Sequence, residues 1–202
     1  MIKVIAFDYG GVIKLYENDL FGDICNYLKI NKDDWFQEYH KIDDIYNSGN
    51  EDFEDVMFSL ASKFNNSKET KSFIKKLLRD GKGKSHINTE LIEIIKKLKD
   101  KGYKTPLLSN NSSTLRQKLI EYNISELFDE IILSGEVGFA KPDPNIFKIL
   151  FEKLNVDPQE VVFIDNSPRM FEGSKEIGYT PILYRNNEDF KKELSKILEI
   201  EL

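Results

Sequence analysis

Two aspartates stand where buried strands are predicted to end. Asp8 and Asp165 each directly follow a run of four apolar residues, which is typical of a buried parallel strand. Open α/β sheets gather their ligands at the carboxyl ends of the strands. Two carboxylates at such ends can hold Mg2+, which prefers hard oxygen ligands and keeps several of its waters. The pair therefore predicts a divalent-cation site at one edge of a sheet.

Groups that suit a phosphate dianion occur at two further points. Ser109 and Asn110 follow another apolar run and precede a helical pattern, so a hydroxyl and main-chain N–H groups meet at a helix start, a natural anion site. Lys141 supplies a cation. Displacement at phosphorus requires charge neutralisation and positioning, and a carboxylate can attack to give an aspartyl phosphate. Each residue alone also fits a plainer role, as a turn aspartate, a helix-capping serine or a surface lysine.

The elements that would carry these residues alternate between strands and helices. Apolar runs predict strands over residues 4–7, 105–108, 130–133, 161–164 and 181–184, and stripes of helical period predict helices between them. Asp143 as N-cap and Pro144 at the first position open one of these helices. Such alternation predicts an α/β fold with a parallel sheet covered on both faces. Pro106 lies inside a predicted strand, and we expect its missing N–H to fall where the sheet needs no donor.

Residues 15–86 break the alternation. They read as all helix, which predicts a core domain of residues 1–14 and 87–202 with an inserted helical domain of residues 15–86 standing above the carboxyl edge of the sheet. Residues 14–16 connect the two as a hinge or a plain linker, and both readings stay open. The predicted inserted helices and turns are Asp19–Leu28, Lys32–Tyr46, Phe53–Phe64 and Lys71–Arg79, with turns at Ser48–Asn50 and Asn65–Asn66.

Aromatic side chains in this insertion allow two interpretations. Trp35, Phe36, Tyr39 and Tyr46 could line a substrate pocket. Their helical spacing in a small helical domain favours a core role instead.

Composition restricts the class of protein. The chain has 202 residues, 40% hydrophobic and 32% charged, which fits one soluble globular unit with at most a small inserted domain. A net charge of -6 argues against nucleic acid or an anionic membrane as a partner. A single cysteine fits a reducing compartment, and Asp8 interrupts the first apolar run too early for a signal peptide. We therefore expect a cytoplasmic protein, acting as a monomer or weak homodimer.

The chain resembles the haloacid dehalogenase-like (HAD) hydrolase superfamily, in its subfamily with a helical cap after the first strand. Single motifs of this family are weak signals, but their order on successive strands is specific. The matching motifs, in chain order, are Asp8 with Gly10 and Gly11, Ser109-Asn110, Lys141-Pro142 and Asp165.

This resemblance implies a Rossmann-like core and hydrolysis of small phosphorylated metabolites with Mg2+ as cofactor. Asp8 would be the nucleophile, and Lys141 and Ser109 would assist it. The implied metal ligands are Asp8, the Gly10 carbonyl and Asp165. The implied phosphate contacts are Ser109, Asn110, Lys141 and Gly11.

Two positions depart from the family pattern. Phosphatases of this family usually carry a second aspartate two residues after the nucleophile as general acid and base, and here Gly10 occupies that place. General acid–base catalysis contributes about 10²–10⁴-fold, so we expect slower turnover or a preference for good leaving groups. Asn166 replaces a further common aspartate; its amide oxygen or a water that it holds could still serve a metal.

Two alternatives remain. A 2-haloacid dehalogenase also lacks the second aspartate and pairs a tyrosine with a glycine, but it needs no metal and replaces the last aspartate, which this chain keeps as Asp165. A non-catalytic module that binds a phosphorylated ligand or a protein is compatible with Gly10. The presence of Asp8, Lys141 and Asp165 together argues against it, because binding alone needs no nucleophile.

Overall fold

The computed structural model describes residues 1–17, 19–47, 53–81 and 84–201. The chain divides into two compact units, Met1–Leu15 with Ile87–Leu202, and Tyr16–His86. Buried apolar side chains form separate clusters in the two units. Each unit is therefore built around a core of its own.

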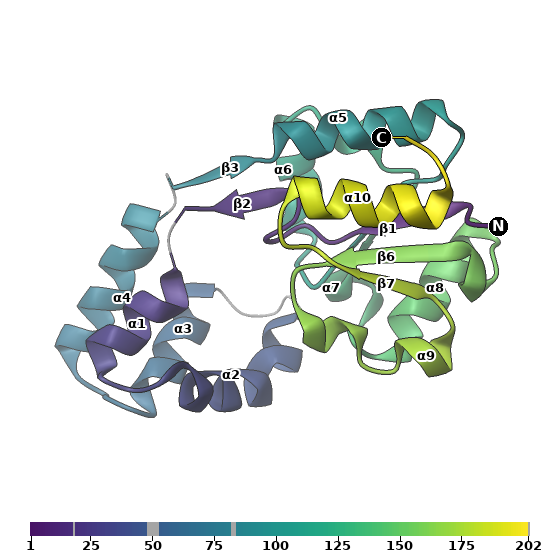
Figure 1. Ribbon diagram of the computed structural model, residues 1–202. Coiled ribbons are helices and arrows are strands. Elements are labelled where there is room, and N and C mark those ends of the chain that lie inside the picture. Colours follow the sequence, from purple (N-terminus) through teal and green to yellow (C-terminus); the bar gives the residue numbers. More distant parts are fainter. Residues whose placement is uncertain (18, 48–52, 82–83, 202) are drawn as a thin grey trace. The chain divides into compact units, whose positions relative to one another are not determined.

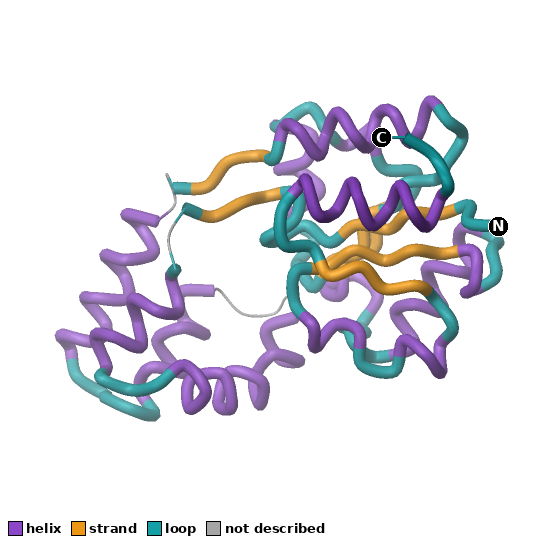
Figure 2. Tube along the Cα trace, viewed as in Figure 1, coloured by secondary structure: helices purple, strands orange, loops and turns teal. Residues whose placement is uncertain are grey.

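The first unit contains a five-stranded sheet in which every described pair of neighbouring strands is parallel. Its order is β5-β4-β1-β6-β7. Figure 1 labels β1, β6 and β7 side by side, and Figure 2 shows the strands in orange between helices. The alternating pattern thus correctly predicts an α/β fold with a parallel sheet. The strands are β1 Val4–Phe7, β4 Leu107–Ser109, β5 Ile131–Leu133, β6 Val161–Asp165 and β7 Thr180–Leu183.

Helices cover both faces of this sheet. The central strands β1 and β6 are therefore buried along their whole length. One face packs on α5 Thr89–Asp100, α6 Thr114–Glu121 and α10 Asn187–Leu198. The other packs on α8 Pro144–Leu154, with the short helices α7 Ser134–Val137 and α9 Ser174–Ile177 beside it. The predicted start of α8 is confirmed, since the Asp143 side chain accepts from the Asn145 N–H and Pro144 is the first helical residue.

The prediction that Pro106 lies inside a strand is wrong. β4 begins one residue later, at Leu107. The carbonyl of Pro106 still accepts a hydrogen bond from the Phe7 N–H at 2.9 Å. Proline thus contributes an acceptor at the strand entrance, where no donor is required of it.

Strand register brings the polar strand ends together. Phe7 of β1 lies opposite Ile164 of β6 and opposite Leu107 of β4. One step further along the chain, the Asp8 N–H donates to the Ile164 carbonyl at 2.9 Å. Asp8 and Asp165 therefore leave neighbouring strands at the same edge of the sheet.

The second unit is helical. Its helices are α1 Leu20–Leu28, α2 Lys32–Asn47, α3 Phe53–Ser62 and α4 Lys68–Gly81. Trp35 is fully buried at the centre of its core, and Phe36 and Tyr39 pack around the same cluster, as the core interpretation predicts. The side chain of Tyr46 and the predicted turn at residues 48–50 lie outside the described residues.

The reading of residues 15–86 as all helix is wrong at both ends of the segment. Lys14–Tyr16 forms strand β2, which pairs with β3, Ser85–Ile87, in a separate two-stranded sheet. Residues 14–16 are therefore a paired strand and not a plain linker. Both strands are only three residues long and partly exposed, so they carry no hydrophobic alternation that sequence analysis could detect.

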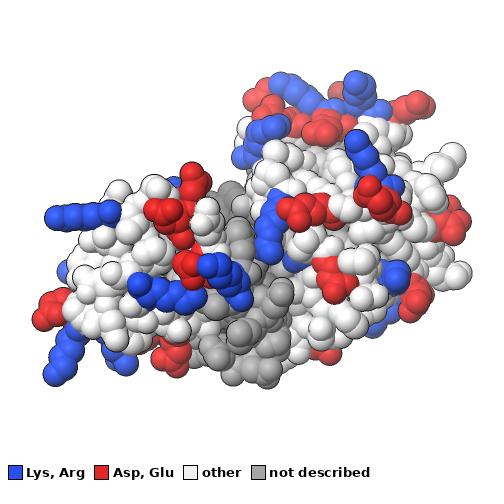
Figure 3. Space-filling model, turned by 90° about the horizontal axis from the view of Figure 1, so that it is seen from below, with Lys and Arg blue, Asp and Glu red and all other residues white. Residues whose placement is uncertain are grey.

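Charged side chains of both signs are mixed over the face shown in Figure 3, where no large patch of one sign stands out. Such mixing is typical of solvated helix surfaces. Among the helices of the described residues, none is both long and apolar enough to cross a bilayer.

Candidate functional site

The site is organised around the ammonium group of Lys141. Its Nζ lies 2.7 Å from Asp8 Oδ1 and 2.7 Å from Asp165 Oδ2. The three residues come from distant parts of the sequence, yet they are buried, with exposed fractions of 7% for Asp8, 3% for Lys141 and 2% for Asp165. Three groups that the sequence analysis singled out thus meet at one point at the carboxyl end of the sheet.

Burial and charge act against each other in this cluster. Burial lowers the pKa of Lys141, but the carboxylates of Asp165 and Asp8 outweigh it and hold that pKa above the ordinary lysine value. Burial raises the pKa of Asp165 to about 6; Lys141 opposes the rise and Asp8 adds to it. Two carboxylates share one ammonium, so the site carries more negative than positive charge in a region with little water to screen it.

Two further contacts, neither of them predicted from the sequence, orient these groups. The Ser167 N–H donates to Asp165 Oδ1 at 2.9 Å, which leaves Oδ2 facing Lys141. Lys141 Nζ lies 5.0 Å from the centre of the Phe163 ring, within cation–π range. The signal for Phe163 was present: it stands two residues before Asp165 in a strand, and residues at that spacing share a face.

Ser109 and Asn110 lie at the end of β4, beside the cluster in the sheet order. Ser109 is buried, and α6 begins a few residues later at Thr114. The Asn110 side chain bonds to the main chain of Lys141: Oδ1 accepts from the Lys141 N–H at 2.7 Å, and Nδ2 donates to the Lys141 carbonyl at 2.9 Å. Asn110 and Lys141, two of the predicted phosphate contacts, are therefore linked through the Asn110 side chain.

Gly10 and Gly11 form the turn after Asp8 and differ in conformation. Gly11 has φ +78°, and a Cβ there would lie 2.4 Å from Asn166 Nδ2, so only glycine fits without a rearrangement. Its N–H donates to the Lys14 carbonyl at 2.8 Å, a hydrogen bond within the turn. Gly10, in contrast, is not one of the described glycines that have a positive φ. A side chain at Gly10 is therefore not opposed by a left-handed backbone.

The donor set suits Mg2+. Asp8 and Asp165 converge on one point, and within the described part of the chain no group of three or more His, Cys, Asp or Glu side chains suits a metal. A cation here would be held by two carboxylates and further oxygens. This matches Mg2+, which is usually bound through one or two carboxylates and keeps several waters.

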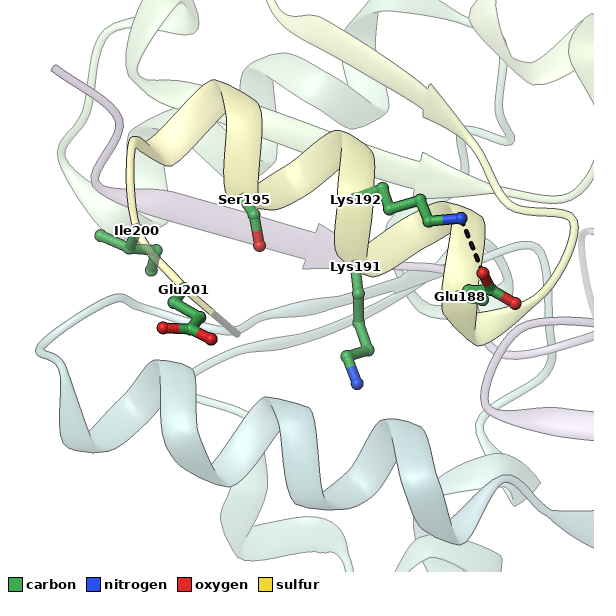
Figure 4. Close-up of a pocket in the computed structure, with 6 residues that line it drawn as sticks. All are labelled: Glu188, Lys191, Lys192, Ser195, Ile200 and Glu201. Carbon is green, nitrogen blue, oxygen red and sulfur yellow. Dashed lines mark hydrogen bonds and ion pairs between the residues drawn. The ribbon is translucent and has the colours of Figure 1, made fainter.

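A surface depression elsewhere in this unit is unrelated to the cluster. It has a volume of about 410 Å³ and lies against α10 and the residues that follow it (Figure 4). Lys192 there pairs with Glu188 of the same helix at 2.6 Å. None of the predicted site residues lines it; its lining residues are Glu188, Lys191, Lys192, Ser195, Ile200 and Glu201.

Comparison with known proteins gives the family. The model of the haloacid dehalogenase-like hydrolases matches residues 2–178. The chain therefore belongs to this family of hydrolases. The match spans all the residues of the site.

Curated relatives include both phosphatases and dehalogenases. The chain is 33% identical over 121 residues to bifunctional epoxide hydrolase 2 of Sus scrofa, covering 57% of this chain and 22% of that protein; it thus spans about a fifth of the first curated relatives that it matches. It is 25% identical to D-ribitol-5-phosphate phosphatase of Bacteroides thetaiotaomicron, over 98% of this chain and 99% of the relative. It is 33% identical to (S)-2-haloacid dehalogenase 1 of a Pseudomonas species, over 42% and 38% of the two chains.

A solved structure gives the fold. A HAD family enzyme of Bacteroides thetaiotaomicron, crystallised with magnesium and inorganic phosphate, superimposes with a TM-score of 0.64 at 21% sequence identity. The match covers 96% of this chain and 99% of that one. At this level of identity the likeness concerns the fold alone.

Proposed function

We propose that this hydrolase is a Mg2+-dependent phosphatase of small phosphorylated metabolites, with Asp8 as its nucleophile. The observation that carries the proposal is the contact of one buried ammonium with two carboxylates from neighbouring strands. A nucleophile at a strand end, a second carboxylate and a fixed cation are the groups that transfer of a phosphoryl group requires.

Asp8, Asp165 and the main-chain carbonyl of Gly10 would hold the metal. Bound there, Mg2+ would supply positive charge against the phosphate oxygens and the two carboxylates. Removing the two carboxylates from water is costly unless their charge is balanced. Two carboxylates and only one ammonium leave an excess of negative charge around Lys141. This excess, which belongs to the chain's own residues, favours the binding of a metal cation at the site.

The reaction has two steps, formation and hydrolysis of an aspartyl phosphate. A carboxylate oxygen of Asp8 forms a bond to phosphorus as the bond from phosphorus to the substrate oxygen breaks, and the leaving oxygen takes a proton. Water then attacks the phosphorus of the aspartyl phosphate, which releases phosphate and restores the Asp8 carboxylate. Ser109, the Asn110 main chain and Lys141 would position the phosphate. Gly10 has no side chain that could exchange protons, so proton supply comes from water, the substrate or another residue.

The helical unit Tyr16–His86 is proposed as the specificity domain, equivalent to a helical cap. Functions on a shared core are usually set by added segments and loops. Since the aromatic residues Trp35, Phe36 and Tyr39 are occupied in the core of this unit, they are not proposed as substrate contacts.

The test is a screen of the purified protein against a panel of phosphorylated metabolites. Activity should appear with Mg2+ and disappear with EDTA. Asp8→Asn should abolish it, because an amide is a poor nucleophile, whereas Asp189→Asn on the exposed surface of α10 should retain it. Hydrolysis that persists undiminished in EDTA would refute the role of the metal, and a fully active Asp8→Asn protein would require another nucleophile.

The same preparation tests the two alternatives. Chloride release from 2-chloropropionate in metal-free buffer, faster than any phosphate release, would identify a dehalogenase. Binding of inorganic phosphate without turnover of any substrate in either assay would identify a binding module. Retention of Asp165 against Lys141 favours the phosphatase.

A further inference from the structure

The Asn110 side chain bridges the loop after β4 and the loop that carries Lys141. Its amide accepts from the Lys141 N–H and donates to the Lys141 carbonyl. One side chain thus pairs with both main-chain polar groups of a single residue 31 positions further along the chain. A neighbouring strand would normally supply this kind of pairing.

The Lys141 main chain lies outside regular structure. Residues 138–143, between α7 and α8, form neither helix nor strand. The ammonium nevertheless has to reach two carboxylates at once, with 2.7 Å to each. A displacement of about 1 Å in such a group can cost about 10²-fold in rate. The loop therefore needs a support that helices and strands do not give it.

We propose that the Asn110 side chain is a positioning residue, which fixes the Lys141 main chain so that Nζ reaches both Asp8 and Asp165. Asn110 then acts through Lys141, and its side chain does not bind the substrate phosphate. The consequence for catalysis rests on the proposed function. The structural consequence, a fixed Lys141 loop, does not.

Amide hydrogen exchange measured by NMR tests the structural part. Asn110→Ala should make the Lys141 N–H exchange at least about tenfold faster, because this proton loses its acceptor. Asn111→Ala is the matched control: it shortens the neighbouring asparagine, whose Oδ1 accepts from the Ser112 N–H, so exchange at Lys141 should not change. Protection of the β1 and β6 amides reports that each variant is folded.

Asn110→Asp is the second variant, in case the alanine protein does not fold. It keeps an acceptor for the Lys141 N–H and loses the donor to the carbonyl, so protection at Lys141 should be retained more than in Asn110→Ala. Unchanged exchange at Lys141 in a folded Asn110→Ala protein would overturn the proposal. This result is valid even if the protein hydrolyses no phosphate ester.

A double-mutant cycle with Lys141→Ala tests the catalytic part. Asn110→Ala alone should lower kcat/KM by about 10–100-fold, but by less than about 2-fold when Lys141 is already alanine. Equal losses in both backgrounds would show a direct contact with substrate or a general structural role, and would refute positioning through Lys141. A wild-type protein without phosphatase activity would refute the proposed function and leave the exchange measurement to decide the positioning role.

Discussion

Lys141 balances one of the two buried carboxylate charges of the site. Its side chain is almost fully enclosed, and both of its ionic partners are buried as well. Removal of one partner from such a group leaves an uncompensated buried charge, which is far more costly than the loss of a surface pair.

Lys141→Met should therefore destabilise the metal-free protein by about 3–5 kcal/mol, measured by urea unfolding in EDTA. Lys153→Met is the control, because Lys153 forms an ion pair at the surface. Its Nζ lies 3.1 Å from Glu130 Oε2, and the two side chains are 47% and 32% exposed. Its loss should cost less than about 1 kcal/mol. Equal unfolding free energies for the two variants would contradict the picture of a charge-balancing lysine.

Gly10 leads to a prediction about leaving groups. Without a proton donor at this position, the rate should fall steeply as the pKa of the leaving alcohol rises, so p-nitrophenyl phosphate should be cleaved faster than alkyl phosphates. Gly10→Asp should flatten this dependence. A series of phosphate esters assayed on both proteins measures the two slopes. Equal slopes, with circular dichroism showing a folded variant, would mean that protons are not supplied through this position.

Among the elements, the turn between β1 and β2 contains Asp8, the proposed nucleophile, and Gly10, a proposed metal ligand. The turn combines a left-handed glycine, Gly11, with direct contact to the Asn166 side chain from the loop after β6. The first and last of the predicted motifs are therefore packed against each other through a residue that has no side chain.

Gly11→Ala should destabilise the protein more than Gly102→Ala. Both glycines have positive φ, which costs roughly 1–2 kcal/mol for an alanine, but a Cβ at Gly102 meets nothing within 4 Å. Urea unfolding of the two variants measures the difference. Adding Asn166→Ala to Gly11→Ala should bring the loss down to the level of Gly102→Ala. If the second substitution gives no recovery, Asn166 is not the obstacle.

In the whole molecule, the two units have cores that share no residue. Each buries its own apolar side chains, so we expect packing within each unit to contribute mainly to the stability of that unit. Domains with separate cores can open separately.

Leu60→Ala, in the core of the helical unit, should cost about 2–5 kcal/mol locally. Hydrogen exchange should accelerate in α1, α3 and α4, while amides of β1 and β6 keep their protection. Ile5→Ala in β1 is the reciprocal variant and should accelerate exchange in the sheet. If either substitution accelerated hydrogen exchange in both units, the two units would unfold together and the prediction would be wrong.

The sequence predicted most of the sheet, because buried parallel strands are continuous apolar runs. It also singled out Asp8, Lys141 and Asp165, whose side chains the structure brings together; the two aspartates stand at the ends of such runs, whereas Lys141 lies in a loop. It could not predict β2 and β3, which are short and partly exposed. The link from Asn110 to Lys141 also escaped prediction, since it depends on which loops meet in space. Phe163 was taken only as a strand residue, although its spacing from Asp165 placed it beside the charges.

The distribution of the charge cluster along the chain also affects how the protein folds. Lys141 and Asp165 are 24 residues apart, whereas Lys141 and Asp8 are 133 residues apart. Closing the longer loop costs more chain entropy, and non-local pairing slows folding. The pair of Lys141 and Asp165 can form while β1 is still undocked, but Asp8, the proposed nucleophile, arrives only with β1. We therefore expect recovery of the proposed phosphatase activity after dilution from denaturant to follow the insertion of β1 between β4 and β6. An intermediate that lacks β1 would expose the edges of both strands to other chains.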